Sequence, residues 1–224
     1  MPWFKQALLL MASLSLLSIG ISSGAQTPPS DERGSEQANL YYQMALSSVS
    51  EKQYEQARQY LNLVINLDPT NVPAYYQRGL VWIELGILSC AYDDFTAVLH
   101  LDPNNYDAYY QRGSIQLGYG QYKSAIWDFN RAINIDDKRP EAYCGRGEAR
   151  AAYGKLKLAL QDFSQVIALT PGYYPAYLGR AKVYRQMEDY SSAEADLILV
   201  RDNCADGELV AKVLEMLVEC QTAN

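Results

Sequence analysis

Apolar residues in this chain fall into short stretches of helical period, and the pattern recurs every 34 residues. Tyr75–Gly79 (YYQRG) returns unchanged as Tyr109–Gly113, and a Leu-Asp-Pro run precedes each copy, at Leu67–Pro69 and Leu101–Pro103. A fixed period of this length is typical of one supersecondary unit that is copied head to tail. The pattern therefore predicts an array that grows along one axis.

The period continues without insertion from Ala38. It predicts five copies, at residues 38–71, 72–105, 106–139, 140–173 and 174–203. Each copy holds two apolar stretches of helical period, which in the second copy are residues 74–85 and 88–101. The Leu-Asp-Pro runs end the second helix, because proline lacks an amide hydrogen and disfavours helical geometry in the residue before it. Residues 207–221 carry one further apolar face and are predicted to form a capping helix.

Conserved sizes at fixed places in the copies indicate how the two helices pack. The fourth place is always tyrosine, at Tyr41, Tyr75, Tyr109, Tyr143 and Tyr177. The eighth place is always small, at Ala45, Gly79, Gly113, Gly147 and Ala181. The twentieth is always alanine, at Ala57, Ala91, Ala125, Ala159 and Ala193. Small residues let facing backbones approach, and larger side chains then fill the remaining space.

With these places assigned, residues 38–203 resemble a tetratricopeptide repeat (TPR) protein. The family signature is met in the second copy by Tyr75, Gly79, Ala91, Phe95 and Pro103. Asp137 departs from it in place of the proline of the third copy, and Leu61 and Leu197 replace the second aromatic in the end copies. The resemblance implies an all-α fold, a right-handed α-solenoid of five helix-turn-helix units followed by the C-terminal capping helix.

The N-terminal segment has the composition of a targeting signal. Lys5 is followed by an uncharged apolar run at residues 7–19, and small residues stand at Ser23–Ala25. This order predicts a signal peptide at residues 1–25 and export to the periplasm or secretion. The alternative is a retained membrane anchor formed by residues 3–21. Residues 26–37 are rich in proline, serine and charge and are predicted to be a flexible linker.

Charge and reactive residues exclude several functions. The net charge of −7 argues against nucleic acid, whose binding proteins need a basic surface. The single histidine, His100, cannot build a histidine-rich metal site, and no nucleophile has a base at a recognisable spacing. We therefore expect no enzyme activity, no cofactor and no metal. The cysteines are expected to be buried or half-buried fillers, not disulfides, and are Cys90, Cys144, Cys204 and Cys220.

Arginine occupies the seventh place of four copies, and aspartate follows it sixteen residues later. These residues are Arg78, Arg112, Arg146 and Arg180, with Asp94, Asp128, Asp162 and Asp196. The first copy has Met44 and Tyr60 instead, so both partners are absent together. The joint absence predicts a structural ion pair within each repeat. The alternative is a ladder of arginines for an acidic ligand.

The family resemblance also implies where a ligand binds. In TPR proteins the concave wall is formed by the second, fifth, sixth, ninth, twelfth and thirteenth places of each first helix. The peptide-binding residues that this implies are Tyr42, Gln43, Leu46, Tyr76, Gln77, Leu80, Tyr110, Gln111 and Ser114. The last two copies supply a thinner and more charged wall, with Cys144, Gly145, Glu148, Leu178, Gly179, Lys182 and Arg185. The lysine, arginine and asparagine set with which some relatives hold a C-terminal carboxylate is missing.

These observations lead to one functional hypothesis and one main alternative. The hypothesis is a non-catalytic protein–protein interaction scaffold outside the cytoplasm, which binds another protein or an extended, weakly charged peptide in its concave groove. The alternative is a self-associating structural subunit or assembly factor, a homo-oligomer formed through the groove or the cap. An accessory role to an enzyme ranks third. Contact with a membrane is expected only if the N-terminal segment is retained.

Overall fold

The computed structural model describes residues 30–223, with side chains from 34 to 220. The chain divides into two units, residues 1–34 and 35–224, and the second unit holds the array of helices. Within the described residues there are eleven helices and no strand. None of these helices combines the length and the apolar character needed to cross a membrane. The predicted signal peptide and the alternative anchor lie outside the described residues.

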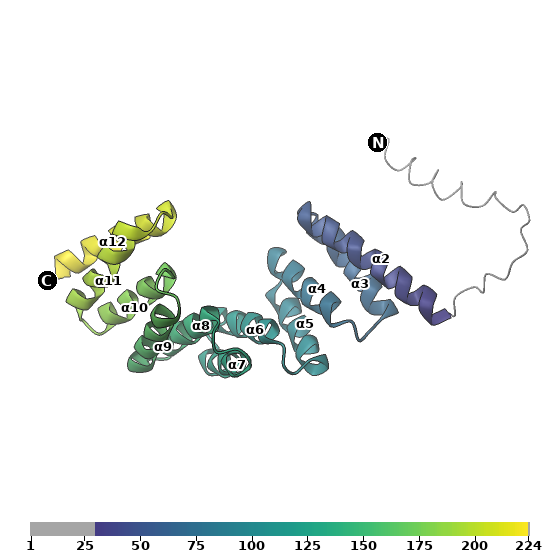
Figure 1. The fold of residues 1–224 in the computed structure, drawn as a ribbon, viewed down its shortest axis with the longest axis horizontal. Coiled ribbons are helices and arrows are strands. Elements are labelled where there is room, and N and C mark those ends of the chain that lie inside the picture. Colours follow the sequence, from purple (N-terminus) through teal and green to yellow (C-terminus); the bar gives the residue numbers. More distant parts are fainter. Residues whose placement is uncertain (1–29, 224) are drawn as a thin grey trace, which may run out of the picture. The chain divides into compact units, whose positions relative to one another are not determined.

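The helices fall into five pairs and a final single helix (Figure 1). The first helices of the pairs are α2 (Ser30–Ser50), α4 (Val72–Glu84), α6 (Tyr106–Gly118), α8 (Pro140–Ala152) and α10 (Tyr174–Gln186). The second helices are α3 (Tyr54–Leu67), α5 (Leu88–Leu101), α7 (Tyr122–Ile135), α9 (Leu156–Leu169) and α11 (Tyr190–Asn203). The helix α12 (Gly207–Ala223) follows and packs against α11. This confirms the predicted all-α solenoid with a capping helix.

One boundary differs from the sequence prediction. The linker predicted at residues 26–37 is helical from Ser30, because α2 begins there and continues to Ser50. No proline occurs between Pro29 and Pro69, so nothing in this stretch removes a helical hydrogen bond. Ala38, near the middle of α2, is 6% exposed and belongs to the first core cluster. The predicted linker therefore overlaps the first two turns of a helix whose buried side begins at Ala38.

The turn inside every repeat places its fifteenth residue in the left-handed region. The φ angles are 74° at Gly86, 70° at Gly120 and 78° at Gly154. Glycine reaches this region without strain because it has no Cβ. Lys52 and Glu188 occupy the same place in the first and last repeats, with φ of 58° and 62°. The geometry of the turn is thus kept in all five repeats, while glycine is used only in the three inner ones.

Between repeats, the Leu-Asp-Pro runs start the next first helix. The Asn71 side chain accepts a hydrogen bond from the Ala74 amide at 3.0 Å, and its own amide group donates to Asp68 at 3.0 Å. An N-cap of this kind satisfies an amide that the first turn of a helix leaves without a partner. Asn105 repeats both contacts with Ala108 and Asp102. The proline ends one helix, and the asparagine two residues later starts the next.

The core of the inner repeats is built on three phenylalanines packed against glycine. Phe95, Phe129 and Phe163 are at most 1% exposed. A Cβ added to Gly145 would lie 2.5 Å from the Phe129 ring, and one added to Gly179 would lie 2.5 Å from the Phe163 ring. Each ring therefore occupies the space that a side chain of the following repeat would need. Burying a phenylalanine contributes about 1.5–3 kcal/mol, so these contacts couple neighbouring repeats.

The first helices form one wall of the array. Each second helix packs on the first helix of the next repeat, and α8 also packs directly on both α6 and α10. Because each repeat stacks on the next in the same way, the first helices succeed one another along the array. The places that the family resemblance assigned to the concave wall belong to these helices.

Candidate functional site

Tyr76 and Tyr110 form the centre of the predicted groove. Each is half-buried and lies at the fifth place of a first helix, in α4 and α6. The Tyr76 ring lies 5.6 Å from the Phe95 ring, and the Tyr110 ring lies 6.0 Å from the Phe129 ring, measured between centroids. Core contacts on one side hold both rings in place while part of each remains accessible. Such rings offer contact area with little conformational entropy left to lose.

A polar contact joins the row of tyrosines to the row of glutamines. The Gln111 side chain interacts with the Tyr76 hydroxyl across the boundary between the second and third repeats and slightly lowers its pKa. Burial raises the pKa of Tyr42, Tyr76 and Tyr110 above the ordinary value of 10.0. All three hydroxyls are therefore protonated at neutral pH, and each can donate as well as accept a hydrogen bond.

Two cavities open along the wall of the first three repeats. The first, here called the Tyr76 cavity, has a volume of about 240 Å³. Its lining residues are Tyr42, Val72, Pro73, Tyr76, Gln77, Asn105 and Asp107. The carboxylate of Asp107 is already neutralised, because it accepts a hydrogen bond from Arg139 at 2.8 Å. That guanidinium also covers the Tyr106 ring, 3.7 Å from its centroid.

The second, here called the Glu84 cavity, has a volume of about 330 Å³. It is lined by Val49, Tyr54, Gln77, Leu80, Val81, Ile83, Glu84 and Gln111. Gln77 lines both cavities, so the two adjoin. Together they extend from the first to the third repeat and define the candidate binding groove.

The predicted groove residues do not all reach the cavities. Tyr42, Tyr76, Gln77, Leu80 and Gln111 line one or both of them. The other four lie on the same helices outside the cavity linings, with Gln43 exposed and Leu46, Tyr110 and Ser114 half-buried. The Ser114 hydroxyl donates to the Tyr110 carbonyl at 2.9 Å, within α6.

Sequence reasoning missed several lining residues. Glu84 stands at the thirteenth place of its copy and Asp107 at the second, so the family's wall positions already contained the signal for both. Tyr54 could not be found in this way, because it belongs to the second helix α3 and reaches the groove from the preceding repeat. Its position depends on how two repeats stack, which the spacing within one repeat does not define.

Part of the predicted wall of the last two repeats is buried, although Lys182 and Arg185 line a separate cavity of about 360 Å³. Cys144, Leu178 and Gly179 are buried, so they offer no surface to a ligand. Burial raises the pKa of Cys144 to about 12, which keeps this thiol protonated and unreactive. Glu148 and Lys182 remain exposed. Although the Glu148 side chain keeps exposed surface, the neighbouring helices remove enough water around its carboxyl group to raise its pKa, and Lys182 lowers this pKa to a smaller extent.

The arginines and aspartates lie at the junctions of helices and not in the cavities of the groove. In all four repeats the guanidinium group of the arginine donates hydrogen bonds from two nitrogens to the aspartate. In the third repeat, Arg112 Nε and Nη2 lie 2.9 Å and 2.7 Å from the two carboxylate oxygens of Asp128. Bidentate pairs of this kind are strong and directional. The Asp128 side chain is 0% exposed and that of Arg112 is 13% exposed. Desolvation raises the pKa of Asp128, and the bonds from Arg112 oppose this shift.

The third nitrogen of each arginine reaches the preceding repeat. Arg78 Nη1 donates to Asn62 at 2.7 Å, and Arg146 Nη1 donates to Asn130 at 2.6 Å. Thr96 and Ser164 accept in the same way from Arg112 and Arg180. The guanidinium groups are therefore occupied by protein partners on both sides. This geometry favours the structural role over a ladder for an acidic ligand.

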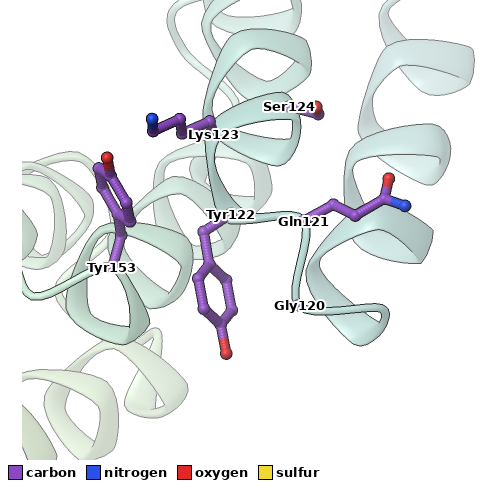
Figure 2. A pocket seen from close by; sticks show the side chains of 6 residues that line it. All are labelled: Gly120, Gln121, Tyr122, Lys123, Ser124 and Tyr153. Atoms are coloured by element: carbon purple, nitrogen blue, oxygen red, sulfur yellow. The ribbon is translucent and has the colours of Figure 1, made fainter.

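A further cavity of about 360 Å³ lies away from the groove, next to the turn between α6 and α7 (Figure 2). It is lined by Gly120, Gln121, Tyr122, Lys123, Ser124 and Tyr153. Lys123 Nζ lies 5.5 Å from the centroid of the Tyr153 ring, and Figure 2 shows Gln121 and Ser124 pointing away from that ring. All lining residues except Tyr122 are exposed, so this is an open surface hollow. It has none of the apolar walls of the Glu84 cavity.

Comparison with known families and structures agrees with this architecture. The model of the tetratricopeptide repeat family matches residues 38–71 and 106–139. No curated protein sequence matches the chain. The matched segments are the first and third of the five repeats described above. These two segments therefore match tetratricopeptide repeats, in agreement with the paired helices of the fold.

Solved structures extend the likeness to most of the chain. YrrB, described as a TPR protein with an unusual peptide-binding site, is 26% identical, with a TM-score of 0.68 over 82% of this chain and 95% of its own. MamA residues 41 to the end, from Desulfovibrio magneticus RS-1, is 23% identical, with a TM-score of 0.68 over 83% and 97%. A tetratricopeptide repeat protein from Parabacteroides merdae ATCC 43184 is 20% identical, with a TM-score of 0.72 over 83% and 73%.

Proposed function

We propose that this protein is a non-catalytic scaffold that binds an extended segment of another protein in the groove of its first three repeats. The observation that carries the proposal is the pair of adjoining cavities, which share Gln77 and are bordered by Tyr42 and Tyr76. A hollow bordered by Tyr42 and Tyr76, with a second hollow beside it, suits successive side chains of an extended peptide.

The chemistry of the wall supports a polypeptide ligand. A glutamine amide both donates and accepts hydrogen bonds, which matches the alternating amides and carbonyls of an extended backbone. Gln77 and Gln111 supply such groups beside Tyr76. The apolar side chains of Leu80 and Ile83 supply the area whose burial drives association. The peptide-binding site named for the structurally similar YrrB adds support from a protein of the same fold.

The place of action that we propose is outside the cytoplasm. The basic start, the apolar run at residues 7–19 and the small residues at Ser23–Ala25 together favour export with removal of residues 1–25. Retention of residues 3–21 as an anchor is the alternative, and it would hold the same groove at a membrane surface.

Selection from a random peptide library tests the proposed binding. The full-length chain is immobilised and used to select peptides of about twelve residues displayed on phage. Peptides that bind the groove should fail to bind the variant Tyr76→Ala with Tyr110→Ala. The variant Tyr119→Ala with Tyr153→Ala is the matched control, because it also removes two accessible tyrosines, 51% and 40% exposed, from turns outside the groove.

The two possible outcomes of this selection are distinct. Peptides that bind the wild-type chain and the control but not the groove variant support the proposal. Peptides that bind all three proteins equally would place the binding surface elsewhere. Circular dichroism of the variants at equal concentration shows whether the helical content is retained, which separates loss of binding from loss of fold.

Self-association is the second candidate function. The observation that favours it is the exposed apolar side chains of α12, where Leu214 is 48% exposed and Val218 is 60% exposed. The mass of the protein in solution decides between the two candidates. A stable oligomer that dissociates on replacement of Leu214 and Val218 by serine favours self-association, and a monomer with a free groove favours the scaffold.

A further inference from the structure

The Glu84 cavity combines apolar walls with one charged group. Val49, Leu80 and Ile83 are half-buried and supply the apolar surface, while Glu84 is exposed. The remaining lining residues are neutral at pH 7, and none is a lysine or an arginine. An apolar hollow that carries a single carboxylate is suited to a side chain with a long aliphatic stem and a cationic end.

Glu84 and Asp107 are the two acidic residues that line the cavities, and of these Glu84 has no cationic partner among the described residues. Asp107 in the neighbouring cavity is paired with Arg139. Glu84 interacts with the neutral Tyr54 hydroxyl, which lines the same cavity and whose pKa it raises. Within the described residues, no lysine, arginine or histidine lies within ion-pair distance of Glu84. The cavity thus has an unused negative charge at a fixed place.

We infer that the bound segment presents a lysine or arginine side chain to the Glu84 cavity. The inference rests on the proposed function and specifies the chemistry of its ligand. The stem of the basic side chain packs between Leu80 and Ile83, and its charged end bonds to the Glu84 carboxylate. The amide oxygens of Gln77 and Gln111 are further acceptors on the walls of the cavity.

The charge of the whole protein acts in the same direction. A net charge of −7 attracts a basic segment and repels an acidic one during the encounter. Charge-assisted hydrogen bonds are about twice as strong as neutral ones, so a basic residue gains both affinity and a fixed register. The expected ligand is therefore an extended peptide with a lysine or arginine adjacent to the residue that occupies the Tyr76 cavity.

Peptides selected on the full-length chain provide the test. The sequences that depend on Tyr76 and Tyr110 should be enriched in lysine or arginine at one position. Replacing a lysine with norleucine, which keeps the aliphatic stem and lacks the amine, or an arginine with uncharged citrulline, should weaken binding to the wild type about tenfold. The same change in the peptide should have little effect on its affinity for the Glu84→Gln variant. Glu215→Gln is the charge-matched control, because it removes one exposed carboxylate from α12.

The outcomes separate this inference from the proposed function. Groove-dependent peptides without an enriched basic residue would overturn the inference and leave the groove proposal standing. The same holds if the uncharged peptide loses equal affinity for the wild type and for Glu84→Gln. Peptides that do not depend on Tyr76 and Tyr110 would overturn both. The inference is supported if the uncharged peptide loses affinity for the wild type and for the Glu215→Gln control but not for Glu84→Gln.

Discussion

Arg112 is hydrogen-bonded to Thr96 of the preceding repeat, with 3.3 Å between Nη1 and the threonine hydroxyl. The same guanidinium holds Asp128 of its own repeat, so one side chain joins three helices in two repeats. This contact explains the break in the series at Met44. The first repeat has no preceding repeat to reach, and an arginine there would lack one of its partners.

The first prediction concerns this ion pair. Asp128→Ala removes the partner of a largely buried guanidinium, and breaking a buried pair costs about 3–5 kcal/mol. Arg112→Ala should lower the free energy of unfolding by a similar amount. The loss in the double variant should be much smaller than the summed losses of the two single variants. Urea unfolding of all four proteins measures the coupling. Arg201→Ala breaks an exposed pair with Asp202 and should leave the midpoint unchanged. Additive losses would show that the two residues do not act together.

The second prediction concerns the glycines of the repeat junctions. Gly145→Ala places a Cβ 2.5 Å from the Phe129 ring, which is 0% exposed, so the ring or the backbone must shift. Overpacking of this kind costs about 1–3 kcal/mol. Gly118→Ala is the control, because its added Cβ meets no atom within 4 Å. There alanine should be neutral or should stabilise by up to about 1 kcal/mol. Equal effects at both positions, measured by urea unfolding, would contradict the packing account.

The third prediction follows from the raised pKa of Glu148. Because folding raises this pKa above the ordinary 4.5, the folded chain holds the proton more tightly than the unfolded chain. The resulting stabilisation is complete below pH 4.5 and is lost as the pH rises through the folded pKa. The glutamine in Glu148→Gln does not ionise, so this variant keeps its stability as the pH rises.

Thermal unfolding as a function of pH measures the effect. The melting temperature of Glu148→Gln should exceed that of the wild type at pH 7, and the difference should disappear below about pH 4.5. Glu215→Gln removes the same charge from α12 and serves as the control. A lower melting temperature for Glu148→Gln at pH 7 would mean that the carboxylate has a stabilising partner.

The fourth prediction concerns the N-terminus. If Ser23–Ala25 is the processing site, the exported protein begins at Gln26 and remains in solution without detergent. N-terminal sequencing of the protein purified from its native compartment makes the measurement. Met1 on a membrane-bound form would establish the anchor instead.

The repeat explains how much of this protein could be predicted from its sequence. Tyr75, Gly79 and Phe95 recur at fixed places because each repeat makes the same contacts with its neighbours. A period of 34 residues therefore predicted the helix pairs and the turns between them. Where a residue lacks copies, as in residues 30–37, the period gave no guidance, and the helical start of α2 was missed.

The groove was harder to predict than the fold. Tyr76 and Gln77 were assigned from a place within one repeat, which is a local property. The Glu84 cavity forms between Tyr54 of α3 and residues of the next two repeats. Its shape depends on the stacking of repeats, which follows from the packing of many side chains. The burial of Leu178 has the same cause, because its place in the repeat is identical to that of the half-buried Tyr76.

The central claim, that the groove binds an extended peptide, is tested most directly by isothermal titration of the tightest selected peptide. The titration compares the wild type with two single variants of the groove, Tyr76→Ala and Tyr110→Ala. The control is the double variant Tyr119→Ala with Tyr153→Ala. Truncation of an interface residue of this kind costs about 2 kcal/mol or more, which corresponds to a loss of about 30-fold in affinity. We predict that loss for Tyr76→Ala and for Tyr110→Ala, and unchanged affinity for the control. Unchanged affinity in both groove variants, with their helical content intact, would contradict the account.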